Sequence, residues 1–151
     1  MADGYSGKDF LAGLAEDWDV VLRKPVKQEM PDGRMRTYIH GSGPDGIFVS
    51  AGYADHRNIS SLICTSESSG DVRFLDACTE LDVAGLDHRK AHAWFDKVKK
   101  RTDRRHEREA AQSPGPAPWV VSDVLTSGPV ILVLDRANRS YRLRILGRAA
   151  R

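Results

Sequence analysis

Strand-like segments in the first half of this chain are separated by short loops, and that spacing constrains the fold more than any other feature. Four segments rich in β-branched and apolar residues cover positions 20–22, 34–40, 47–51 and 59–65. Parallel neighbours would need crossover connections of a dozen residues or more. The loops here are shorter, so we predict an antiparallel sheet.

Alternation within the strands indicates which positions face a core. Between positions 34 and 40, Met35 and Ile39 fall on one face and Tyr38 and His40 on the other. Glycines in the segment after His40 indicate a turn there. The spacing around Ser42 does not fit a nucleophile elbow or a phosphate-binding loop.

The last third of the chain returns to strand-like patterns at 119–121, 130–134 and 141–145. Residues 130–134 are apolar at every position, which favours a place in the middle of a sheet. Residues 136–139 are short enough to join the last two strands as a hairpin.

Two helices are indicated at 7–17 and 87–111, and residues 72–81 fit either a short strand or a helix. The proline-rich segment 113–118 cannot continue the second helix and predicts a stiff connector. The order of elements predicts an α+β fold in a single domain over residues 1–151. We expect a mainly antiparallel sheet, with an N-terminal helix and one long charged helix packed on one face.

Composition excludes several classes of protein. The chain has 151 residues, of which 40% are hydrophobic and 29% charged, which argues against membrane, collagen-like and fully disordered proteins. The first residues resemble no signal peptide, and Cys64 and Cys78 are too few for a disulfide framework. We therefore expect a cytoplasmic protein with two reduced, buried thiols. The excess of Arg over Lys, 16 to 7, is typical of a high-GC bacterial genome.

The net charge of +2 conceals a strong separation of charge along the chain. Residues 1–87 carry 8 basic and 15 acidic side chains, whereas residues 88–151 carry 15 basic and 6 acidic ones. The formal charge is therefore −7 for residues 1–87 and +9 for residues 88–151. A basic half of this kind indicates an anionic partner.

The long helix concentrates that positive charge. At about 100° per residue, its apolar stripe ends at Val98, which predicts that the second half leaves the core. A row of cations on that half fits contacts with nucleic-acid phosphates. The candidate residues on the helix are Lys97, Lys100, Arg101, Arg104, Arg105 and Arg108. The alternative is a solvated helix stabilised by pairs four residues apart, such as Lys99–Asp103 and Arg105–Glu109.

Arg142 and Arg144 form a second candidate basic patch, because they project from the same face of the last strand. Tyr141 falls on the opposite face, which argues against the interleaved aromatic and basic side chains that bind single strands. The alternative for these arginines is an edge strand kept soluble by charge.

The sequence contains no motif with the residues and spacing of a catalytic or metal site. His88, His92 and Asp96 lie four residues apart on one helix face, but no Glu follows the first histidine and two cations lie between the histidines. Cys64 lies in an apolar strand, where a small buried hydrophobic role is ordinary. We predict no catalytic residue, no metal and no cofactor, and an enzyme is the less favoured class.

The leading hypothesis is a non-enzymatic protein that contacts DNA or RNA phosphates through the basic helix. The alternative is a protein-interaction or chaperone-like module, which forms a homodimer or grips a protein client through its acidic and basic surfaces. No membrane partner is expected, because no apolar run approaches 20 residues.

Overall fold

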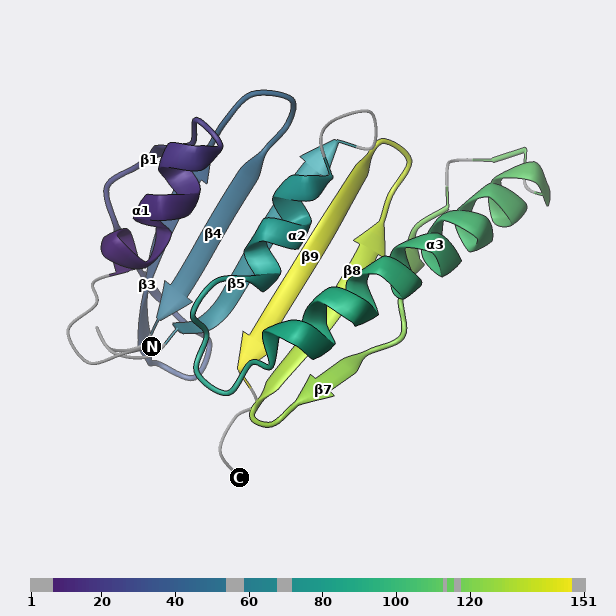
Figure 1. Cartoon of the computed structure of the whole chain (residues 1–151). Helices are drawn as coiled ribbons and strands as arrows, with labels where there is room; N and C mark the ends of the chain where they lie inside the picture. Colours follow the sequence, from purple (N-terminus) through teal and green to yellow (C-terminus); the bar gives the residue numbers. More distant parts are fainter. Residues whose placement is uncertain (1–6, 54–58, 68–71, 113, 116–117, 148–151) are drawn as a thin grey trace.

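The structure is a computed structural model that describes residues 7–53, 59–67, 72–112, 114–115 and 118–147. Three helices occur in this part: α1 (Gly7–Asp17), α2 (Arg73–Thr79) and α3 (His88–Gln112) (Figure 1). The strands of the first half are β1 (Val21–Leu22), β2 (Val26–Glu29), β3 (Met35–Ser42), β4 (Phe48–Tyr53) and β5 (Ile59–Glu67). Those of the second half are β6 (Val120–Val121), β7 (Leu125–Ser127), β8 (Val130–Arg136) and β9 (Ser140–Gly147).

All the strands join one antiparallel sheet in the order β1-β3-β4-β5-β9-β8-β6, with β2 on β3 and β7 on β8. The short loops between successive strands explain the antiparallel pairing. The predicted α+β fold is confirmed. The segment 72–81, which fits either element from its sequence, contains helix α2.

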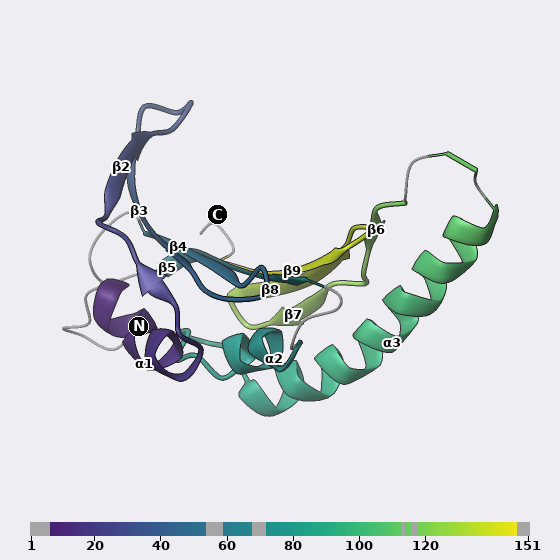
Figure 2. The ribbon, with the colours of Figure 1, turned by 90° about the horizontal axis from the view of Figure 1, so that it is seen from above.

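The three helices cover one face of the sheet and leave the other face open (Figure 2). The sheet curves so that its open face is concave. In β9, Tyr141, Leu143 and Ile145 are buried, whereas Arg142 and Arg144 alternate with them and are half-buried. The buried set belongs to the core under the helices, so the two arginines lie on the open face.

The position of β9 corrects one expectation. β9 lies between β5 and β8 and pairs with both, so Arg142 and Arg144 are not on an edge strand. The chain returns after α3 and inserts its last strand beside β5. Local sequence patterns carry no information on that long-range pairing.

β3 continues two residues further than the glycine pattern suggests, so the predicted turn begins after Ser42. Gly41 is buried within the strand, and a Cβ atom there would lie 2.6 Å from Cγ1 of Val20. The glycine is therefore needed for close packing under α1 and β1 rather than for a turn.

The two cysteines are joined, contrary to the predicted pair of reduced thiols. Cys64 of β5 and Cys78 of α2 form a disulfide, and both are fully buried. Packing of α2 on the sheet brings the two residues together, although they are 14 positions apart in the chain.

The second half of α3 does not leave the core where its apolar stripe ends. The buried line continues through Thr102 and His106, which are 3% and 6% exposed. β6 and β8 lie under this part of the helix. None of the described helices has the length and apolar character needed to cross a membrane.

Candidate nucleic-acid interface

The two predicted basic patches lie on opposite sides of the sheet. α3 packs on the covered face, whereas Arg142 and Arg144 point from β9 to the open face. The eight candidate residues therefore do not form one continuous surface.

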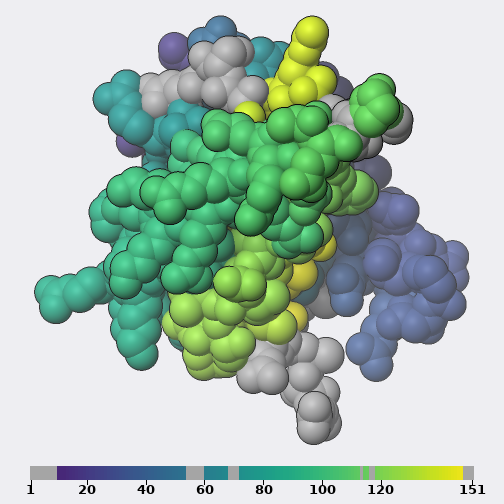
Figure 3. Space-filling view, turned by 90° about the vertical axis from the view of Figure 1, so that its right-hand side faces the viewer, coloured from purple at the N-terminus to yellow at the C-terminus, as the bar shows by residue number. Residues whose placement is uncertain are grey.

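The outward side of α3 carries a continuous set of cations, which we call the α3 ridge. Its members are Lys97, Lys100, Arg101, Arg104 and Arg108, and all five are exposed. At about 100° per residue they fall within a sector roughly 100° wide, away from the buried line of the helix. Between residues 97 and 108 this sector contains no other residue type. Figure 3 looks onto this side of the molecule, where α3 lies uncovered across the surface above β7.

Acidic side chains border the ridge but do not interrupt it. Asp96 and Glu107 are exposed on one flank of the helix. Arg101 lies 3.5 Å from the carboxylate of Asp123, and both side chains remain mostly exposed, so this pair is weak. In the described part of the chain, no ion pair involves the other four ridge cations.

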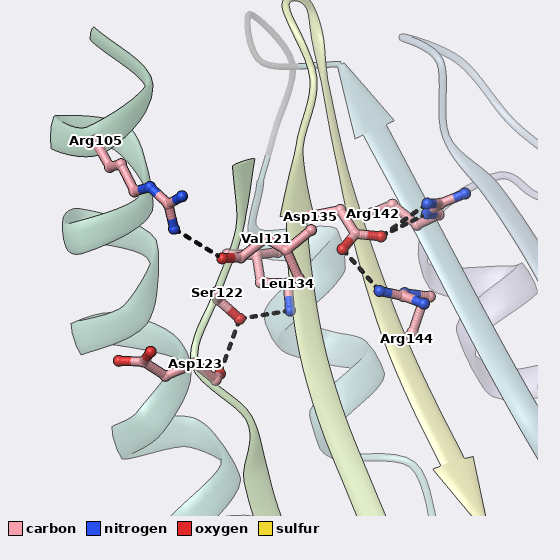
Figure 4. A network of polar contacts seen from close by, with 8 residues as sticks. All are labelled: Arg105, Val121, Ser122, Asp123, Leu134, Asp135, Arg142 and Arg144. Carbon is pink, nitrogen blue, oxygen red and sulfur yellow. Dashed lines mark hydrogen bonds and ion pairs between the residues drawn. The ribbon is translucent and has the colours of Figure 1, made fainter. Parts of the chain in front are cut away.

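Arg105 differs from the ridge residues because its contacts hold the fold together. Its Nε donates to Glu109 at 2.8 Å. Its Nη1 reaches the carbonyl oxygen of Val121 at 3.5 Å (Figure 4). Ser122 in turn accepts a hydrogen bond from the backbone N–H of Leu134 at 2.9 Å. The first contact joins β6 to α3, and the second joins the residue after β6 to β8.

Lys99 also belongs to an internal network. Asp103 accepts hydrogen bonds from Lys99 Nζ at 2.9 Å, from Arg136 Nη1 at 2.5 Å and from the hydroxyl of Tyr141 at 2.5 Å. Burial would raise the pKa of Asp103, but these donors outweigh it and hold the pKa below its usual value. Burial, and then the adjacent carboxylate of Asp103, raise the pKa of Tyr141. The network links α3 to β8 and β9.

On the open face, the carboxylate of Asp135 lies between Arg142 and Arg144 (Figure 4). Nε and Nη2 of Arg142 contact Oδ2 at 2.9 and 2.8 Å, and Nη2 of Arg144 contacts Oδ1 at 2.9 Å. The side chain of Asp135 is only 3% exposed. The two arginines are therefore held in place, and they contribute one net positive charge with the aspartate.

The open face also carries aromatic side chains that the pattern around Tyr141 did not predict. Trp119 lies over Arg142, with the guanidinium carbon 5.2 Å from the ring centroid. Tyr38, His40 and Phe48 form a row on β3 and β4, with ring centroids 5.8–6.0 Å apart. The alternation in residues 34–40 placed Tyr38 and His40 on one face, but only the sheet order shows that Arg142 and Arg144 share it.

Two of the three histidines of α3, His88 and His92, contact α2 and its C-terminal end. Nδ1 of His88 lies 2.8 Å from the carbonyl oxygen of Thr79, and Nδ1 of His92 lies 2.8 Å from Oδ1 of Asp76. Nε2 of His92 is 3.8 Å from Asp96. Within the described residues, no group of three or more His, Cys, Asp or Glu side chains is arranged to hold a metal ion.

Comparison with known proteins finds no match for this chain among protein-family models, curated proteins or solved structures.

Proposed function

We propose that the protein binds nucleic acid by contacting its phosphates with the α3 ridge. The observation that carries this proposal is the uniform charge of the ridge, where every residue of one helix sector between 97 and 108 is Lys or Arg. Four of these cations have no carboxylate partner among the described residues. Their charge is therefore available to an external anion.

The form of the ridge suits a phosphate backbone. Residues 97–108 span about 16 Å along the helix axis, whereas each strand of a duplex carries one phosphate per 3.4 Å of its axis. The ridge can therefore face several consecutive phosphates. Contacts between α3 and β6, β7 and β8 hold the helix rigidly, so its cations need little ordering on binding.

The test is a binding titration with labelled DNA and RNA, single-stranded and duplex, at about 50 and 200 mM salt. Releasing counterions from about four contacts predicts a loss of affinity between these concentrations of roughly 50-fold for a single strand and roughly 150-fold for a duplex. The variant Lys97→Glu/Arg104→Glu/Arg108→Glu should lose at least about tenfold in affinity at low salt.

A matched control reverses three exposed cations elsewhere, on and near the β1–β2 segment, in Arg23→Glu/Lys24→Glu/Lys27→Glu. It changes the net charge equally but leaves the ridge intact. Equal losses in the two variants would mean that net charge, not the ridge, attracts nucleic acid. Absence of salt-sensitive binding in the unaltered protein would overturn the proposal.

A second candidate function is the protein-interaction module, in which two copies associate or a client is held. It is favoured by the open concave sheet face, where Phe48 is 37% exposed, and by the separation of acidic and basic halves. Light scattering at low and high salt tests self-association. A monomer at both salt concentrations would exclude the homodimer.

The Cys64–Cys78 disulfide favours an oxidising compartment over the cytoplasm expected from the sequence, because disulfides persist mainly in oxidising compartments. Counting free thiols in protein quenched directly from cells distinguishes the two locations. Two free thiols would support the cytoplasm, and none would contradict it.

A further inference from the structure

The open face of the sheet contains a pocket of about 310 Å³ beside the end of β8 and the start of β9. Its lining residues are Thr65, Trp119, Asp135, Ala137, Ser140 and Arg142. Thr65, Arg142 and Asp135 are direct neighbours across β5, β9 and β8. The floor is therefore rigid sheet, and Trp119, from the segment leading into β6, forms a wall.

Trp119 offers a stacking surface in this pocket. The residue is 63% exposed, although the guanidinium of Arg142 lies over its ring. An aromatic ligand can therefore stack on the uncovered part of the indole. Such contacts bind bases of any sequence, because every base presents a π-face.

Arg142 supplies anion-binding donors next to the indole, and Arg144, two residues further along β9 and outside the pocket lining, adds donors beyond the pocket. Each guanidinium has five N–H donors, and Asp135 engages two nitrogens of Arg142 and one of Arg144. Within the described residues no hydrogen bond or ion pair engages Nη1 of either arginine, so these atoms can contact an anion. The buried carboxylate fixes both guanidinium groups, as a preorganised phosphate site requires.

Besides Asp135, which lines the pocket, a second acidic side chain lies near this region. Glu67 faces Ser140 across the β5–β9 pair. Its side chain rests against Gly46, where an added Cβ atom would lie 2.4 Å from Cγ of Glu67. The other polar side chains that line the pocket are the hydroxyl groups of Thr65 and Ser140.

We propose that this pocket binds one nucleotide unit of a single strand, with its base stacked on Trp119 and its phosphate against Arg142 and Arg144. The volume is at the lower end of ligand sites and suits one base with its sugar. A duplex does not fit, because its bases are already stacked and paired. The inference rests on the proposed nucleic-acid function and narrows it to single strands.

The position of β6 connects the pocket to the α3 ridge. Trp119 directly precedes β6, and β6 lies beside α3 through the contact of Arg105 with Val121. Arg101 of the ridge reaches Asp123, which follows β6. A flexible strand that passes round this edge can contact both sites, which a stiff duplex cannot do.

The test compares single strands and duplexes of equal length with the full-length protein and with three variants. Trp119→Ala should lower single-strand affinity about tenfold, which is typical of one lost stack, and change duplex affinity less than twofold. Trp119→Phe should restore most of the loss. Val124→Ala removes another exposed apolar side chain outside the pocket and should change neither.

The outcomes separate this inference from the proposed function. In one outcome, single strands and duplexes bind equally, with an affinity that Trp119→Ala leaves unchanged and that reversal of the ridge lowers. That result would overturn the proposal for the pocket and leave the proposal for the ridge standing. If no oligonucleotide binds, both proposals fail. Titration with adenosine monophosphate tests whether the pocket takes a free nucleotide instead of a strand. In that case adenosine monophosphate would bind and Trp119→Ala would abolish its binding, whereas oligonucleotides would not bind. That result would overturn the single-strand assignment.

Discussion

Asp135 is a buried carboxylate whose two oxygens contact two different arginines, so its removal affects a wider structure than one ion pair. Replacement by Asn keeps the size but removes the charge that holds Arg142 and Arg144. We predict that Asp135→Asn lowers the free energy of unfolding by about 2 kcal/mol, measured by urea denaturation. The arginines are partly exposed and can turn to solvent, which limits the loss.

The control for this prediction is Asp123→Asn, because its ion pair with Arg101 is exposed. It should change the free energy of unfolding by less than about 0.5 kcal/mol. Equal effects of the two substitutions would show that the buried position of Asp135 has no special importance.

Asp103 gives the fold a dependence on acid pH. Its pKa is lowered in the folded protein, because the donors around it outweigh the effect of burial. The resulting stabilisation is complete above the ordinary pKa of 3.8 and is lost as the pH falls through the lower, folded value. We predict that Asp103→Asn destabilises the protein at pH 5–7 and that its deficit shrinks below about pH 4. Urea denaturation measures the difference in free energy of unfolding between Asp103→Asn and the unaltered protein. A difference that stays constant down to about pH 3 would contradict the role of the Asp103 charge.

At the scale of elements, His92 joins α3 to α2 through Asp76. The hydrogen bond and the charge of Asp76 raise the pKa of His92 above 6.5. The contact is therefore fully formed below pH 6.5 and weakens as the pH rises through the folded pKa. We predict that Asp76→Asn lowers the His92 pKa, measured by NMR titration, more than Asp96→Asn does. The more distant Asp96, at 3.8 Å, is the control, and an equal or larger effect from it would contradict the assignment.

The disulfide joins α2 to β5 and closes a short loop. A loop of about this length predicts a stabilisation of about 3 kcal/mol. We expect the Cys64→Ala/Cys78→Ala variant to melt about 6–12 °C below the oxidised protein. Both sulfur atoms are buried, so the folded protein should resist mild reductants. Two reactive thiols in the folded, air-oxidised protein, together with an unchanged Tm, would contradict the bond.

The elements that could be predicted from sequence are those whose signals are local. Alternation identified β3 and β9, and the spacing of apolar residues identified α1 and the first half of α3. The burial of Thr102 and His106 could not be predicted, because it depends on β6 returning under α3 from a distant part of the chain. The pairing of Cys64 with Cys78 depends in the same way on how α2 packs.

At the scale of the whole molecule, the sheet separates the two basic regions that the sequence indicated as candidate contacts to nucleic acid. The α3 ridge lies on the helix side, and Arg142 and Arg144 lie on the concave side (Figures 2 and 4). The sequence could indicate both sets of cations, because charge and spacing are local properties. It could not show that Trp119 stands beside Arg142, because that contact requires the order of β6, β8 and β9.

The central claim is that the ridge binds phosphates, and the salt dependence of affinity tests it most directly. A plot of log Kobs against log salt concentration for a duplex, which does not enter the pocket on the open face, should have a slope of about −3.6, at about −0.9 for each of four unpaired ridge cations. Lys97→Glu/Arg104→Glu/Arg108→Glu should bring the slope close to zero, whereas reversing Arg23, Lys24 and Lys27 should leave it at about −3.6. A slope near zero in the unaltered protein, or one that survives reversal of the ridge, would contradict the claim.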